Sequence, residues 1–130
     1  MSKVVARPIG TEFRFVEGSD VVRLEYTPGR LVIHVRAAKK APTAIVEFET
    51  ILGFRVLNER DLTEYWPACS TPNGWFFEVQ SGGWLSQERE RDGSCIAAMN
   101  PEAKEYLVTG DDDCVSVLSR GAPVVREDMP

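Results

Sequence analysis

The amino-acid sequence predicts a mainly β protein, an antiparallel sheet or sandwich of about eight short strands with one or two short helices. Two observations support this fold class. Apolar and polar residues alternate over short runs, and turn-forming Gly, Pro, Asn and Asp residues separate the runs. An α+β arrangement is the alternative. The 130 residues fit a single domain, 1–130, in which residues 1–10 and 124–130 are expected to fray.

The clearest element is a hairpin formed by residues 20–26 and 31–37. Pro28 and Gly29 suit the two central positions of a type II turn, because Gly tolerates the positive φ that the second of them requires. Centring the turn there places three apolar pairs on one face: Tyr26 with Leu31, Leu24 with Ile33, and Val22 with Val35. The other face is mostly polar, which predicts a sheet with one side in water.

A second alternation runs from Ala44 to Val56, a length of about 40 Å that exceeds a typical strand. We therefore expect a bend or bulge at residues 51–53, where Gly53 relaxes the backbone.

A short helix should follow, with Asn58 as its cap and apolar residues at helical spacing: Leu62, Tyr65 and Trp66. Pro67 is expected to stop it, and residues 66–74 should form a loop.

Two further hairpins are expected in the second half of the chain. Strands at 75–80 and 84–88 flank Ser81-Gly82-Gly83, and strands at 105–109 and 114–119 flank the turn at 110–113. Between these hairpins, residues 87–94 should be a solvated strand end or loop. One helical turn is expected after Asn100, because Pro101 suits a first helical position.

The charge of the chain is unevenly distributed. The formal net charge is −5, which disfavours general nucleic-acid binding. Residues 1–42 carry eight Lys and Arg against four Asp and Glu, whereas residues 43–130 carry seven against sixteen. This asymmetry indicates either an ordinary solvated surface or an acidic face that meets a basic partner.

The three cysteines, Cys69, Cys95 and Cys114, are an odd number without a close pair, which argues against a zinc site and against a secreted disulfide framework. The first residues lack the apolar core of a signal peptide, and no run of 18 apolar residues could span a membrane. We expect a cytoplasmic protein.

No catalytic constellation can be assembled from the sequence. His34, the only histidine, should lie on the polar face opposite Arg23, without a carboxylate to orient its ring. Glu47 and Glu49 share a strand face at the spacing of paired carboxylates, but that spacing is common on solvated strands. Nucleotide-binding and hydrolase motifs are absent from the sequence. We expect no enzyme activity and no cofactor.

The acidic turn Asp111-Asp112-Asp113 lacks the ligand number and spacing of a calcium loop, so no metal is expected there. It is interpreted as a hairpin turn or as an acidic tip that faces a partner.

Large aromatic residues lie close together in the sequence: Trp66, Trp75, Phe76, Phe77 and Trp84. They could fill the core or line a ligand pocket. Because Trp75, Phe76 and Phe77 are consecutive, at least one ring must point away from the main core, towards a helix, a pocket or an interface.

Three segments resemble small bacterial proteins of largely unassigned role, some of which are grouped with the immunity proteins of toxin systems. The segments are residues 53–66 (GFRVLNERDLTEYW), 82–85 (GGWL) and 105–115 (EYLVTGDDDCV). The resemblance implies a bacterial, cytoplasmic, non-enzymatic binder and carries over no functional residue.

The functional hypothesis is therefore a protein-binding module that acts through an acidic surface on a basic partner, with an immunity-type protein as its more specific form. The residues expected at that surface are Glu47, Glu49, Asp111, Asp112, Asp113 and one of the two rings Trp75 and Phe76. The alternatives are a small-ligand binder with an aromatic pocket and a homodimer formed through a strand edge or ring patch.

Overall fold

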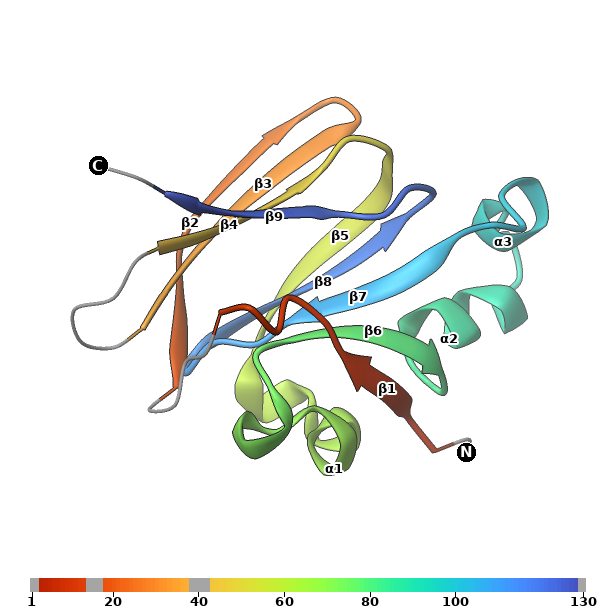
Figure 1. Cartoon of the computed structure of the whole chain (residues 1–130). Helices are drawn as coiled ribbons and strands as arrows, with labels where there is room; N and C mark the ends of the chain where they lie inside the picture. The colour runs from red at the N-terminus through yellow and green to blue at the C-terminus, as the bar shows by residue number, and fades with distance from the viewer. Residues whose placement is uncertain (1–2, 14–17, 38–42, 129–130) are drawn as a thin grey trace.

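A computed structural model describes residues 3–13, 18–37 and 43–128, which form a sandwich of two antiparallel sheets (Figure 1). One sheet has the strand order β1-β6-β7-β8-β5, with β1 Val5–Pro8, β6 Phe76–Ser81, β7 Lys104–Val108, β8 Asp113–Ser119 and β5 Ile51–Asn58. The other has the order β2-β3-β4-β9, with β2 Ser19–Thr27, β3 Arg30–Ala37, β4 Thr43–Phe48 and β9 Val124–Asp128. The predicted mainly β class is confirmed.

The main core lies between the two sheets. Its buried residues come from the four-stranded sheet (Leu31, Ile33, Val35, Ala44, Val46, Phe48) and from or beside the five-stranded sheet (Trp75, Phe76, Tyr106, Val108, Val115, Val117). The ring of Phe48 lies 6.4 Å from that of Phe76 and 5.3 Å from that of Tyr106, so it joins the two layers.

The outer face of the five-stranded sheet is covered by helical segments. One group comprises η1 Glu59–Asp61, η2 Thr63–Tyr65, α1 Trp66–Cys69 and η3 Thr71–Asn73. It buries Leu62, Tyr65 and Cys69 against Phe77 and Leu107 of the sheet. The second group, α2 Trp84–Glu90 and α3 Ile96–Met99, packs Leu85 against Leu118.

The β2–β3 hairpin confirms the predicted turn and two of the three predicted pairs. Tyr26 pairs with Leu31 and Leu24 with Ile33, and Gly29 has φ +82° as a type II turn requires. The prediction that Val22 pairs with Val35 is wrong, because a bulge between Val21 and Arg23 gives Val21 that position. Val22 is left 44% exposed.

The long alternation from Ala44 to Val56 proves to be two strands, and the predicted irregularity at residues 51–53 is confirmed. The chain leaves the four-stranded sheet at Phe48 and enters the five-stranded sheet at Ile51. A register shift between Ile51 and Gly53 bends β5 as it begins.

Asn58 is a cap, as predicted, because its side-chain oxygen accepts a hydrogen bond from the Arg60 N–H at 3.0 Å. The prediction that Pro67 stops a helix is wrong. Pro67 lies in the first turn of α1, where a missing N–H costs nothing, so it favours the start of that helix. Residues 66–74 therefore hold α1 and η3 rather than a plain loop.

Two other local predictions are wrong. Residues 84–88 belong to the helix α2 instead of a strand. The helical turn near Asn100 is α3, which comes before Asn100 in the chain instead of after it. In α2 the indole Nε1 of Trp84 donates to Glu88 one turn later, at 3.3 Å, while Leu85 is buried. Apolar and polar residues alternate poorly over residues 84–90, and several of these residues are good helix formers. A helix this short also needs tertiary packing, which the burial of Leu85 provides.

The chain ends are held in the sheets. β1 pairs with β6 and β9 pairs with β4, so the expectation of fraying is wrong for Val5–Pro8 and Val124–Asp128. Residues 1–2 and 129–130 lie outside the described residues. Over the described part of the chain, every helix is too short or too polar to cross a lipid bilayer.

Candidate functional site: an acidic cleft

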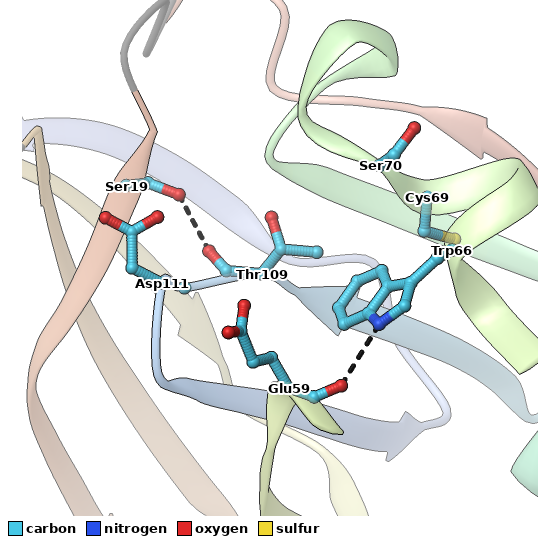
Figure 2. Close-up of a pocket in the computed structure, with 8 residues that line it drawn as sticks. Ser19, Glu59, Trp66, Cys69, Ser70, Thr109 and Asp111 are labelled. Carbon is cyan, nitrogen blue, oxygen red and sulfur yellow. Dashed lines mark hydrogen bonds between the residues drawn. The ribbon is translucent and has the colours of Figure 1, made fainter. Parts of the chain in front are cut away.

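A cleft of about 230 Å³ lies where β7 turns into β8 (Figure 2). Four segments contribute to it: the start of β2, η1, α1 with the residue after it, and the β7–β8 connection. It is lined by Ser19, Glu59, Trp66, Cys69, Ser70, Thr109, Gly110 and Asp111, and we call it the acidic cleft.

Three hydrogen bonds, one from a side chain and two between backbone groups, hold these segments together. The Ser19 hydroxyl donates to the Thr109 carbonyl at 2.8 Å, and the Asp111 N–H donates to the Ser19 carbonyl at 2.8 Å. The Glu59 N–H donates to the Asp112 carbonyl, also at 2.8 Å. The β7–β8 connection is therefore fastened to both β2 and η1, which gives the cleft a fixed frame.

Gly18 allows Asp111 to lie close to β2. Its φ is +104°, and a Cβ atom there would lie 2.8 Å from Oδ1 of Asp111. Any larger residue would therefore displace this carboxylate as well as strain the backbone.

Trp66 forms one wall of the cleft. Its indole N–H donates to the Glu59 carbonyl at 3.0 Å, which fixes the ring beside the Glu59 side chain (Figure 2). The cleft thus combines an aromatic surface with carboxylates.

The cleft carries negative charge that the described residues do not neutralise. Its lining holds two carboxylates, Glu59 and Asp111, and no basic side chain. Burial, and then the negative charges of Asp20 and Asp112, raise the pKa of Asp111. All ion pairs among the described residues use other carboxylates, those of Glu25, Glu47, Glu78 and Glu88.

The thiols near the cleft are unsuited to nucleophilic chemistry. Burial, reinforced by the charge of Glu105, raises the pKa of Cys69 to about 12, so this thiol stays neutral. Burial also raises the pKa of Cys114, and Glu59, Asp113 and Asp111 add to the increase. The same charges that disfavour a thiolate would favour a bound cation.

The predicted acidic residues do not form one surface. Asp111 lines the cleft, and Asp112 and Asp113 are exposed beside it. Glu47 lies at the other end of the four-stranded sheet, where it pairs with Arg30 at 2.9 Å and with Arg126 at 3.7 Å. Glu49 is exposed in the turn between β4 and β5, also away from the cleft.

The prediction that Trp75 or Phe76 anchors a partner is wrong, because both rings belong to the core. Trp75 is 4% exposed, and its indole N–H donates to the carbonyls of Gly10 and Phe13. Phe76 is fully buried between the sheets. Phe77 is the ring that points the other way, towards the helical segments, which is one of the three directions that the sequence predicted.

The sequence does not mark Glu59 as a functional residue, and Trp66 is only one of five candidate aromatic residues in it. The charged stretch at residues 59–61 was a weak signal for Glu59, since such stretches are common on surfaces. The pairing of β5 with β8, which ends at Asn58 and Asp113, and the hydrogen bond from the Glu59 N–H to the Asp112 carbonyl bring Glu59 next to Asp111.

His34 lies opposite Arg23 as predicted, but Glu25 also approaches it, with an oxygen 3.7 Å from Nε2. This neighbour contradicts the expectation of a histidine without a nearby carboxylate. Within residues 3–13, 18–37 and 43–128, no group of three His, Cys, Asp or Glu side chains is arranged to hold a metal ion.

A second polar cluster lies on the outer face of the five-stranded sheet and is buried. Glu105 accepts hydrogen bonds from the Tyr65 hydroxyl at 2.7 Å and from the Leu85 N–H at 2.9 Å. The Tyr65 oxygen in turn accepts the Trp84 N–H at 3.0 Å, and the Arg55 guanidinium lies over the Trp84 ring. This cluster attaches α2 to the sheet.

No protein-family model, no curated protein and no solved structure matches this chain.

Proposed function

We propose that this chain is a non-enzymatic protein-binding module whose acidic cleft receives a Lys or Arg side chain of a basic partner. The observation that supports the proposal is the unneutralised charge of the cleft: two lining carboxylates, further acids beside them, and ion pairs that all lie elsewhere in the described residues. A cation entering the cleft would relieve the mutual repulsion of Asp111, Asp20 and Asp112.

The chemistry of the lining suits such a group. Carboxylates accept charge-assisted hydrogen bonds from ammonium and guanidinium groups, and the Trp66 ring offers a surface on which a cation can stack. The surrounding negative field would also accelerate the encounter with a basic protein and make it sensitive to salt.

A more specific form of this proposal is an immunity-type role in a bacterial cytoplasm. It rests on the sequence resemblance of residues 53–66, 82–85 and 105–115 and on the uncompensated acidic charge. The three cysteines are free, which agrees with a reducing compartment. In this form the partner is a basic toxin whose active surface the module covers.

The proposal is tested by titrating the protein at low salt with a short peptide of Lys and Gly residues. We expect the peptide to shift the NMR signal of the Trp66 indole N–H, which borders the cleft. Asp111→Asn and Glu59→Gln should each weaken binding by up to about fivefold, since one exposed charge pair contributes up to about 1 kcal/mol. Added salt should weaken it further.

Glu102→Gln is the matched control. It removes the same charge from an exposed residue before β7, at the opposite end of that strand from the cleft. If this variant weakens peptide binding as much as Asp111→Asn, the peptide responds only to net charge, and the acidic cleft is not the binding site.

A further inference from the structure

The edge of the four-stranded sheet formed by β2 is long and partly apolar. β2 has nine residues and, among the described strands, pairs only with β3. Its first residue, Ser19, also binds the β7–β8 connection, whereas the described residues leave the other side of residues 22–27 open to a further strand. Val22 and Tyr26 are 44% and 53% exposed on it. Exposed edges of this kind are templates for pairing with another strand.

The turn determines which backbone groups of β2 are free. Thr27 and Arg30 flank the two-residue turn, so Thr27, Glu25 and Arg23 exchange hydrogen bonds with β3. The N–H and C=O groups of the intervening residues Leu24 and Tyr26 therefore point away from β3, towards the open side.

We propose that β2 pairs antiparallel with β2 of a second copy of this chain, about a twofold axis at Leu24. In this register Leu24 faces Leu24 of the second copy, and Val22 faces Tyr26. Arg23 then lies directly opposite Glu25 on each side of the axis. The two four-stranded sheets become one continuous sheet of eight strands.

The charges on β2 select this register. Arg23 and Glu25 occupy positions that do not exchange hydrogen bonds across the new pair, where facing side chains approach most closely. Sliding the second strand by two residues either way would place Arg23 opposite Arg23 or Glu25 opposite Glu25. Both charged side chains are more than two-fifths exposed, and within one chain they form an ion pair with each other. The proposed dimer would replace this pair with pairs across the twofold axis.

The other open strands are less suited to a second copy. β1 has four residues and ends in Pro8, and β9 has five. β5 is nearly as long as β2 but carries a single charge, Arg55, which has no opposite charge to face on the same strand of a second copy. The bulge at Val22 ends the straight part of β2 where the proposed pairing stops.

The experiment is sedimentation velocity of the whole chain over a wide concentration range. We expect the 14.5 kDa chain to associate into dimers as the concentration rises. Arg23→Glu and Glu25→Arg each place like charges opposite each other, so each variant alone should stay monomeric. Mixed together, the two variants carry complementary edges and should form a dimer again.

Arg120→Glu is the control for R23E, because it makes the same charge change at an exposed residue outside the sheets, and it should leave the dimer intact. Circular dichroism checks that each variant is folded. A native chain that stays at 14.5 kDa at all concentrations overturns the proposal. So does a mixture of R23E and E25R that associates no better than either variant alone. Asp111→Asn should not alter dimerisation. The dimer and the binding of a cation in the acidic cleft are therefore tested independently.

Discussion

Glu105 has its carboxyl group in the interior of the protein, where charged side chains are rare. It is 1% exposed, and its partners on the adjacent strands, Val79 and Leu118, are apolar. Three polar side chains from other elements act on its charge or lie near it: Tyr65, Arg55 and Cys69. Burial raises the pKa of Glu105, and hydrogen bonds from Leu85 and Tyr65 oppose the increase. An ionised carboxylate here is costly, and its hydrogen bonds offset part of the cost.

Glu105→Gln should therefore change how stability depends on pH. A carboxyl group whose pKa is higher in the folded chain than its ordinary 4.5 makes the folded chain less stable as the pH rises above 4.5. Gln does not titrate. As the pH rises above 4.5, the free energy of unfolding of the variant should therefore increase relative to that of the native chain. The gain is about 1.4 kcal/mol for each unit by which the folded pKa is raised.

Urea unfolding at a series of pH values measures this gain. Glu102→Gln serves again as the control, because Glu102 is exposed and should show no such trend. If the stability difference between Glu105→Gln and the native chain stays constant with pH, burial does not raise the pKa of Glu105.

At the scale of elements, the sequence predicted strands wherever alternation and turn chemistry agreed. The hairpins of β2 with β3 and of β7 with β8 were predicted with their turns, since both signals are local. α2 was mistaken for a strand, because Gly82-Gly83 before it resembles a hairpin turn. Contacts distant in sequence stabilise that helix: Leu85 is buried against Leu118, and its N–H donates to the carboxylate of Glu105.

Gly82 links this helix to β1 and gives an element-scale prediction. Its φ is +79°, and an added Cβ atom would collide with the backbone of Lys3 and Val4. Gly82→Ala should therefore strain the turn and also push β1 from its place beside β6. Gly93 has a similar φ of +86° with nothing near its Cβ position, so Gly93→Ala isolates the conformational cost of about 1–2 kcal/mol.

Chemical denaturation of the two variants separates the effects. Gly82→Ala should be the less stable by at least about 1 kcal/mol, and hydrogen exchange of β1 should increase. Equal stabilities would mean that β1 yields to the methyl group without losing its pairing.

At the scale of the whole molecule, large rings join the two sheets. Phe48 of one sheet contacts Phe76 and Tyr106 of the other, and all three are buried. The same packing explains why Phe76 is buried. Its ring fills space between the two sheets, and moving the ring to the surface would leave that space empty.

Phe48→Ala should lower the free energy of unfolding by about 3–5 kcal/mol, because it leaves a cavity between the sheets. Val124→Ala, at a side chain that is 59% exposed on β9, should change it by less than about 0.5 kcal/mol. Thermal unfolding of both variants tests this. A small loss for Phe48→Ala would show that the sheets can close over the missing ring.

Within the candidate site, the sequence alone identified Asp111, Asp112 and Asp113, because a run of acids in a hairpin turn is visible without any structure. It could not place Glu59 and Trp66 beside them, since those residues come from η1 and α1, and Glu59 reaches the cleft through a hydrogen bond to Asp112, far along the chain. Trp66 is then held there by its own hydrogen bond to Glu59. The sequence also could not show that Glu47 lies outside the site, because the ion pairs of Glu47 with Arg30 and Arg126 depend on the order of the strands.

The sequence by itself determined the β class, most strands, their turns and the excess of acid, because alternation, turn propensity and charge act over a few residues. The tertiary structure decided the bulge at Val22, the helix α2, the burial of Trp75 and Phe76, and the meeting of Asp111 with Glu59. These features depend on which distant segments compete for the same buried space and hydrogen bonds, and no short stretch of sequence records that competition.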